Sequence, residues 1–464
     1  MSGIDFPIEA PPATPVAPPH VSWRDVIFRR DAISWSMYDF ANTIFSMNII
    51  SLYMKPWIVE DLGRDGFTFD FTVAMSMLAV ALVSPALGVW SDRGARNKGL
   101  LFVFTAGASL ALVALAKTPV QHFALLLMFF GAANFFYEGG MVFYNTLLYS
   151  VARDDRQARY LSGVGTALGY VGAIVGILLI MPFVTGAFLG AQATFITPSG
   201  AHGSFLPTAA LYFLFATPLF FFVRERKRAA RATPSFRVAY ADVWRALRDS
   251  ERYPGVGRFM FVDFCVKNAM NAVILNIGVF CLYVIGMSEV ERASFLTVVT
   301  GAAVIGSFVV GRIAVGASLR RMIGIVACGW MITLALLGVA QSRWEFWVLS
   351  AAAGVLLGAV WTLHRPYLAE IAPRDAVGRM FGLNSLTGKA AAIVGPLWWG
   401  GAFWLCRADG PVGSVISAAL QLDEAARIAL PYRGAAASLT ILVLCGVLAL
   451  RGLPDARAGE EAFT

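Results

Sequence analysis

Apolar stretches, each long enough to cross a lipid bilayer as a helix, recur along the whole chain. A helix needs about 20 predominantly apolar residues to span the hydrocarbon core. The stretches are Ser34–Ile58, Phe71–Trp90, Leu100–Ala116, Phe123–Tyr149, Leu161–Leu189, Phe205–Val223, Phe259–Ile285, Ala293–Gly316, Ile323–Ala340, Phe346–Ala369, Phe381–Leu405 and Ala435–Leu450. They predict an all-α integral membrane protein of about twelve transmembrane helices.

Composition excludes a soluble protein of this length. Of the 464 residues, 58% are hydrophobic and 14% are charged, whereas soluble domains carry roughly 25% charged residues. The five cysteines show no CxxC spacing and lie mostly in apolar stretches. We therefore expect neither a disulfide framework nor a metal site, and no cofactor.

The basic residues predict which helix ends face the cytoplasm. The N-terminal tail and the even-numbered loops hold roughly 25 lysines and arginines, and the odd-numbered loops hold roughly eight, and loops rich in these residues stay on the cytoplasmic side. Both termini are therefore expected in the cytoplasm. The net charge of +8 then reflects topology, and we expect the basic segment 225–257 to lie against anionic lipid head groups rather than nucleic acid.

An internal repeat divides the predicted helices into two groups of six. An offset of 224 residues places Asp39-Phe40 on Asp263-Phe264, and an offset of 223 places Gly88 on Gly311. We expect a disordered proline-rich tail (1–32), a six-helix half (33–224), a basic linker (225–257), a second six-helix half (258–452) and a C-terminal tail (453–464). Parallel repeats of this kind bind a substrate between halves that rock against each other.

The loop after the second predicted helix carries a glycine, an acid and two bases: Gly88, Asp92, Arg93 and Arg96. Their spacing resembles the GxxxDRxGRR signature of the major facilitator superfamily. The resemblance implies twelve helices in two halves related by pseudo-two-fold symmetry, and a cytoplasmic gate built from the charged residues of this loop. In the second repeat Gly311 and Arg312 remain, but Val315 stands where Asp92 maps, which argues against a symmetrical second gate.

A narrower resemblance begins at the first predicted helix. Its sequence WSMYDFAN (35–42) is similar to the WxxYDFAN opening of the branch that contains the fungal vacuolar amino-acid effluxers of autophagy and many bacterial relatives. The stretches 143–148, 167–172, 381–390 and 395–396 match that branch in the same order. The resemblance implies amino-acid export, and a place in a bacterial cytoplasmic membrane.

Two aspartates occupy equivalent repeat positions near the cytoplasmic ends of the first and seventh predicted helices. We expect Asp39 and Asp263, together with Asn42, to serve a gate; the alternative is an interfacial carboxylate favoured by the helix dipole. Asp263 lies four residues before Lys267 on one helical face, so the two either neutralise each other or contact the substrate. Where relatives usually carry an acidic element, the seventh helix offers a cation and two amides as substrate contacts: Lys267, Asn268 and Asn271.

Glu138 falls near the middle of the fourth predicted helix, where a charge is costly to place in a membrane. Polar and aromatic residues share or flank its face at helical spacing: Asn134, Tyr137 and Asn145. We interpret the set as part of a substrate and coupling site in which Glu138 binds an amine or a proton. The alternative is a buried glutamate that only holds two helices together.

Three residues of the tenth and eleventh predicted helices complete the candidate site. Trp361 maps onto Glu138 at an offset of 223, so we expect the aromatic ring and the acid to face each other across a central cavity. Arg365 offers a planar fork for a carboxylate; the alternative is that it reaches the cytoplasmic surface. Lys389 lies near the middle of its helix, where reaching the surface is harder, and the sequence names no partner for it.

Five glycines line the fifth predicted helix: Gly163, Gly165, Gly169, Gly172 and Gly176. Their surroundings are too apolar for a phosphate-binding loop. We interpret them as small residues that let a neighbouring helix approach closely.

These observations predict a secondary transporter that moves a small polar or zwitterionic solute by alternating access, with a proton as coupling ion, and that works as a monomer in the bilayer. A membrane enzyme would need a clustered nucleophile, base or metal, and His364 is the only histidine well inside a predicted helix. The third hypothesis is a sensor or assembly protein that keeps the fold without transporting. No ATP-binding motif occurs, so transport would use a gradient or a separate energising subunit.

Overall fold

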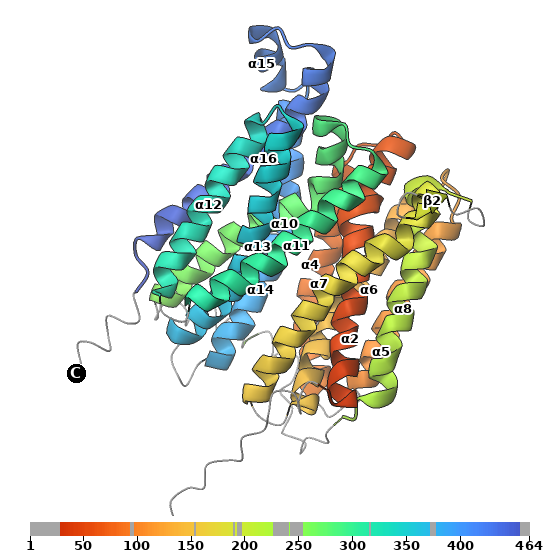
Figure 1. Ribbon diagram of the computed structural model, residues 1–464, viewed down its shortest axis with the longest axis vertical. Coiled ribbons are helices and arrows are strands. Elements are labelled where there is room, and N and C mark those ends of the chain that lie inside the picture. Colours follow the sequence, from red (N-terminus) through yellow and green to blue (C-terminus); the bar gives the residue numbers. More distant parts are fainter. Residues whose placement is uncertain are drawn as a thin grey trace, which may run out of the picture.

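The long helices of the structure run side by side in one bundle (Figure 1). This computed structural model describes residues 28–92, 97–152, 155–188, 191–192, 197–225, 241, 254–314, 317–371 and 377–454. The first part of the chain forms α2 (Arg30–Phe45), α4 (Phe67–Asp92), α5 (Asn97–Lys117), α6 (Phe123–Val151), α7 (Asp155–Thr185) and α8 (Phe205–Phe222). The second part forms α10 (Pro254–Ile285), α11 (Glu289–Ala314), α12 (Leu319–Val339), α13 (Arg343–Ile371), α14 (Val377–Cys406), α15 (Gly413–Ala419) and α16 (Glu424–Leu450).

The first transmembrane segment is a helical run that changes its winding. Helix α2 continues into the π-helix η1 (Ser46–Tyr53), the short α3 (Met54–Pro56) and the π-helix η2 (Trp57–Asp61). A π-turn widens the helix and is frequent at functional sites, and Pro56 has no N–H to donate to a regular ladder. The widened segment touches α10, where a Cβ added at Gly278 would lie 3.0 Å from the carbonyl oxygen of Ser51.

The predicted twelve-helix all-α architecture is confirmed. Among the described residues, ten helices are long and apolar enough to cross a bilayer, and the first helical run and α14 are two further long elements. Within the described part of the chain, the strands are the two-residue elements β1 (Ala187–Phe188) and β2 (Ala191–Gln192). They precede the 3-10 helix η3 (Gly200–Ser204).

The start of the last helix was predicted wrongly. The apolar stretch places it at Ala435, but α16 begins at Glu424, and α15 occupies part of the expected loop. Asp423 caps the helix by accepting a hydrogen bond from the Ala426 amide at 2.7 Å. The charged residues in the first turns lower the apolar content there, so a hydropathy argument starts the helix too late.

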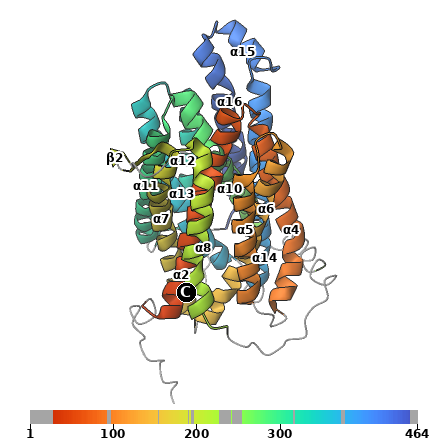
Figure 2. The same cartoon turned by 90° about the vertical axis from the view of Figure 1, so that its right-hand side faces the viewer.

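The two groups of helices pack as halves, with the first half to the right and the second to the left in Figure 1. They meet where α4 contacts α14, where α7 contacts α11, and where η1 and α3 contact α10. We call the end of the bundle where α2 begins and α16 ends the tail end, and the opposite end, which carries α15, the loop end (Figures 1 and 2). The predicted topology places the tail end in the cytoplasm.

The predicted tails and linker lie almost entirely outside the described residues. Helix α2 begins at Arg30 and α10 begins at Pro254. The helical parts therefore extend a few residues beyond the predicted boundaries at 33 and 258.

The glycines of α7 let this helix lie directly against α2, as their spacing predicts. A Cβ added at Gly172 would overlap the backbone of Phe40, and one at Gly169 would lie 2.9 Å from Oγ1 of Thr43. Gly163 is different because it faces open space. The interpretation as packing residues is confirmed for Gly165, Gly169, Gly172 and Gly176.

Replacing Gly172 by alanine is expected to destabilise the protein, because the obstacle is the Phe40 backbone and not a flexible side chain. Overpacking a dense interior costs about 1–3 kcal/mol, so the midpoint of thermal unfolding in detergent should fall. Gly163→Ala is the matched control, since the same methyl group on the same helix meets open space. Equal unfolding midpoints for the two variants would contradict this account.

Candidate functional site

A buried charge cluster joins the halves near the loop end. Lys55 of α3 is 4% exposed, and its Nζ donates a hydrogen bond to Oδ2 of Asp70 in α4 at 2.6 Å. The same ammonium donates to the side-chain carbonyl oxygen of Asn276, a fully buried residue of α10. We call these three residues the loop-end latch. The ion pair lies within the first half, and the hydrogen bond to Asn276 is the contact that crosses to the second half. Because a buried donor that loses its acceptor is costly, this hydrogen bond favours contact between the halves. Sequence reasoning missed it, although a lysine inside an apolar stretch was a signal.

Weaker ionic contacts surround the latch. Arg292 of α11 is 3% exposed, with Nη1 3.8 Å from Oε2 of Glu60 in η2. Nη1 of Arg407 lies 3.4 Å from Oδ2 of Asp65. The second pair is exposed, and such pairs contribute only about 0–1 kcal/mol. Buried polar groups therefore contribute most of the polar stabilisation between the halves at this end.

Between the halves, Glu138 of α6 lies within electrostatic range of a cation of the other half, although no ion pair or hydrogen bond among the described residues joins the two. It interacts electrostatically with Lys389 of α14. The Lys389 ammonium also donates a hydrogen bond to Oγ of Ser84 in α4. Lys389 thus contacts α4 of the opposite half directly and attracts Glu138 of α6 at longer range. The structure supplies the hydrogen-bond partner that the sequence could not name.

A second charge cluster lies inside the second half. Asp263 is fully buried and accepts a hydrogen bond from Nζ of Lys267 at 2.6 Å. Its other carboxylate oxygen lies 2.5 Å from Nδ1 of His364 in α13. Lys267 also lies 5.5 Å from the ring centroid of Trp361, which is a cation–π distance. Of the two alternatives for Asp263 and Lys267, the structure shows the mutual neutralisation, and a substrate contact stays a prediction. His364 was noted only as an isolated histidine within a helix.

Nearer the tail end, Arg365 of α13 is exposed and interacts electrostatically with Asp39 of α2. The Asp39 carboxylate lies against Gly165 of α7, where an added Cβ would overlap it. Asn145 is exposed in the last turns of α6. The structure thus brings Asp39 and Arg365, which the sequence placed on separate helices, to the same interface.

Three predicted residues of the first half make their described contacts within that half. Asn134 donates to Oγ of Ser76 in α4 at 2.7 Å, and Asn42 donates to Sδ of Met141 at 3.2 Å. Tyr137 stacks on an aromatic ring of α2 with ring centroids 4.5 Å apart. These contacts hold α6 against α2 and α4, so a direct role in solute binding or gating stays a prediction for all three.

The remaining predicted residues belong to α10 and to the gate motif. Asn268 is fully buried beside Gly395 of α14, and Asn271 is half-buried. The gate motif cannot be placed, because the side chains of its helical part and the whole of 93–96 lie outside the described residues: Gly88, Asp92, Arg93 and Arg96.

Comparison with known families decides the class of this protein. A protein-family model described as Major Facilitator Superfamily matches residues 40–396 of the chain. The chain belongs to this family. The match spans both halves, so the predicted fold is confirmed, and the protein is a multi-pass membrane protein of a transporter family.

Relatives and solved structures agree with this assignment. An uncharacterized MFS-type transporter of Bacillus subtilis, YxiO, is 25% identical over 383 residues, which cover 80% of this chain and 87% of the relative. An uncharacterized protein of Aquifex aeolicus is 21% identical over 368 residues, or 79% and 88% of the two chains. A bacterial homologue of the human lysosomal transporter Spinster, inward-facing and occupied, superposes with a TM-score of 0.67 at 13% identity over 92% and 96% of the chains. The nucleoside transporter NupG gives 0.66 at 12% identity over 91% and 100%.

Proposed function

We propose that this protein is a secondary transporter that carries a small zwitterionic solute, with an amino acid as the leading candidate. The observation that supports this proposal is the division of charge across the interface. The first half supplies the acids and the second half supplies the bases. Glu60 with Arg292 and Asp65 with Arg407 are ion pairs, and Glu138 with Lys389 and Asp39 with Arg365 attract each other at longer range. A solute that carries one ammonium and one carboxylate fits such an interface in a single orientation.

The first half also holds a buried base and the second half a buried acid, and each of these is neutralised inside its own half. Among the described residues of the first half, Lys55 is the buried cation, and Asp70 of the same half pairs with it. Asp263 is the buried acid of the second half, and its two oxygens are taken by Lys267 and His364. The polarity between the halves is therefore preserved by local pairing.

Exchange of partners explains how a solute could bind at low cost. Its ammonium would replace Lys389 beside Glu138, and its carboxylate would take Lys389 or the fork of Arg365, which suits both carboxylate oxygens. Since the solute supplies both charges together, no buried charge is left unpaired. An amine or an acid alone would leave one partner uncompensated.

The position of the latch supports alternating access. The buried contacts between Lys55, Asp70 and Asn276 close the loop end, which the predicted topology places outside the cell. We therefore assign this conformation to the inward-facing part of the cycle, and transport requires the latch to separate. Glu138 is our candidate coupling residue, because a proton can take the place of the solute ammonium on its carboxylate.

Uptake into liposomes tests the proposed function. With the purified protein reconstituted, we expect at least one labelled amino acid to accumulate when a pH gradient is imposed and to equilibrate without one. The corresponding amine without the carboxylate should compete at least about 30-fold more weakly, since an unpaired buried charge costs about 2 kcal/mol or more. Absence of flux for every amino acid, or equal competition by the amine, would contradict the proposal.

A further inference from the structure

A basic groove opens at the tail end of the first half, between the start of α2 and the end of α8, which pack against each other. It is an open groove with a volume of about 310 Å³, and its walls are formed by three arginines, an aspartate and a phenylalanine: Arg29, Arg30, Arg224, Asp31 and Phe222. Because the groove lies where two membrane-spanning helices end, it is at the level of the lipid head groups.

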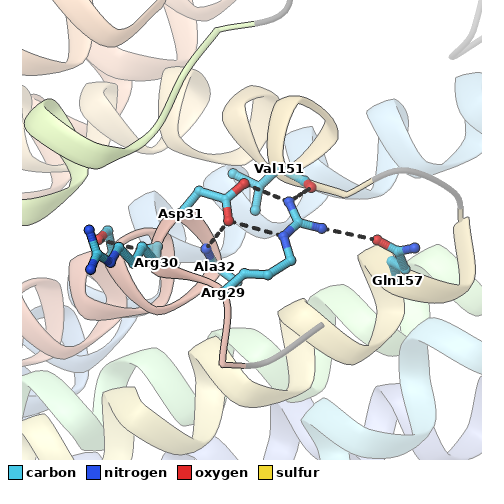
Figure 3. Close-up of polar contacts among 7 residues, drawn as sticks. Arg29, Arg30, Asp31, Ala32, Val151 and Gln157 are labelled. Atoms are coloured by element: carbon cyan, nitrogen blue, oxygen red, sulfur yellow. Dashed lines mark hydrogen bonds and ion pairs between the residues drawn. The ribbon is translucent and has the colours of Figure 1, made fainter. Parts of the chain in front are cut away.

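One of the arginines is fixed by the protein itself (Figure 3). Nε and Nη2 of Arg29 donate to the two carboxylate oxygens of Asp31 at 3.1 and 2.5 Å. Nη2 also donates to the carbonyl oxygen of Val151 at 2.9 Å, and Nη1 donates to Oε1 of Gln157 at 3.5 Å. The charge of Asp31 is therefore matched by Arg29, and the groove wall is tied to α6 and α7.

The other two arginines keep their charge available. Arg30 and Arg224 are both exposed, and within the described ranges no ion pair engages either guanidinium. Phe222, beside Arg224, is 52% exposed, and Phe28, before the start of α2, is 71% exposed. The groove thus presents two guanidinium groups without an ion pair among the described residues, next to apolar rings. Aromatic and basic residues are enriched in the same way at membrane interfaces.

We propose that this groove binds the phosphate of an anionic phospholipid. Arg30 and Arg224 hold the phosphate oxygens, since guanidinium groups match phosphate geometry, and Phe222 lies against the start of an acyl chain. A soluble anion would use the arginines but would gain nothing from Phe222. Basic pockets at the cytoplasmic ends of transmembrane helices are suited to anionic head groups, and the predicted topology places this groove on that side.

Native mass spectrometry of the full chain in detergent tests the proposal, with phosphatidylglycerol and cardiolipin as probes and phosphatidylcholine as the neutral lipid. Arg30→Gln combined with Arg224→Gln should weaken binding of the anionic lipids about 30-fold, because each substitution removes a charge-assisted contact with the bound phosphate. Arg321→Gln combined with Arg451→Gln is the matched control. Both of these residues are exposed at the tail end of the second half, and the pair removes the same charge. We expect it to leave lipid binding nearly unchanged.

Two further arms separate a lipid from a free anion. Phe222→Ser should weaken lipid binding but should not change any stabilisation of the protein by inorganic phosphate. Millimolar phosphate should not displace the lipid from the unchanged protein. Displacement by phosphate together with no effect of Phe222→Ser would assign the groove to a soluble anion and overturn the proposal. Equal lipid loss in the control variant, or no loss in the Arg30 and Arg224 variant, would overturn it as well.

Discussion

Replacement of Lys55 by methionine is expected to open the loop end. The substitution leaves the Asp70 carboxylate buried without its cation, and removing one partner of a buried pair costs about 3–5 kcal/mol. Asp70 is 1% exposed, so it can recover hydration only if the halves separate at this end. We therefore expect the outward-open state to gain population by about 100-fold, and the midpoint of thermal unfolding to fall.

A second substitution distinguishes the latch from a general loss of stability. Lys55→Met combined with Asp70→Asn removes both charges, so the double variant should recover much of the closed population that each single variant loses. Asn276→Ala leaves the pair intact and removes only the acceptor from the second half. It should open the loop end less than Lys55→Met does. Losses that simply add in the double variant would show that the two charges are not coupled.

Spin labels report the opening directly. Val120 and Val290 are exposed residues of opposite halves near the loop end, at 51% and 42%, and labels on their cysteine variants should move apart in Lys55→Met, in a background without the five native cysteines. Arg343→Gln is the matched control. It breaks the 2.9 Å contact between Arg343 and Glu291, an exposed ion pair of the loop end that lies wholly within the second half. An unchanged distance in Lys55→Met would contradict the latch.

The fold was readable from sequence because membrane insertion depends on the apolar content of each segment. A span such as Phe123–Tyr149 is recognisable by itself, and α6 occupies Phe123–Val151. The spacing of glycines was informative for a similar reason. The small residues Gly169 and Gly172 predict that another helix packs closely, although they do not identify that helix. The approach failed at Glu424, where a cap and charged first turns, rather than apolar content, determine the helix start.

The candidate site was harder to predict because partners far apart in the chain depend on how the halves pack. Lys55 and Asn276 are 221 residues apart, and no local pattern relates them. The repeat aligned Asp39 with Asp263 correctly as equivalent positions, but equivalent backbone positions do not have the same partners. Asp263 forms an ion pair within its half, whereas Asp39 forms none among the described residues and is attracted by Arg365 across the interface only at longer range. Only the pair Asp263 and Lys267, four residues apart, was within reach of helical spacing.

Neutralising Glu138 or Lys389 is expected to abolish transport, with each single variant losing about 30-fold to 1,000-fold in uptake rate. These figures correspond to about 2–4 kcal/mol for leaving one member of a charged pair unpaired. Glu138→Gln leaves Lys389 with only Ser84 as a described partner, and Lys389→Met leaves the Glu138 carboxylate facing an apolar chain. Uptake of the amino acid identified in liposomes is the measurement. Glu345→Gln is the control, because this acid is exposed and lies away from the interface.

The double variant Glu138→Gln and Lys389→Met separates a structural pair from a solute-binding pair. If the two charges only stabilise the bundle, removing both together should restore folding and uptake. If they bind the solute, the double variant should recover thermal stability but remain inactive, because neither the ammonium nor the carboxylate of the solute finds its partner. If uptake by Glu138→Gln still depends on the pH gradient, Glu138 is not the coupling residue. The double variant then still decides whether Glu138 binds the solute.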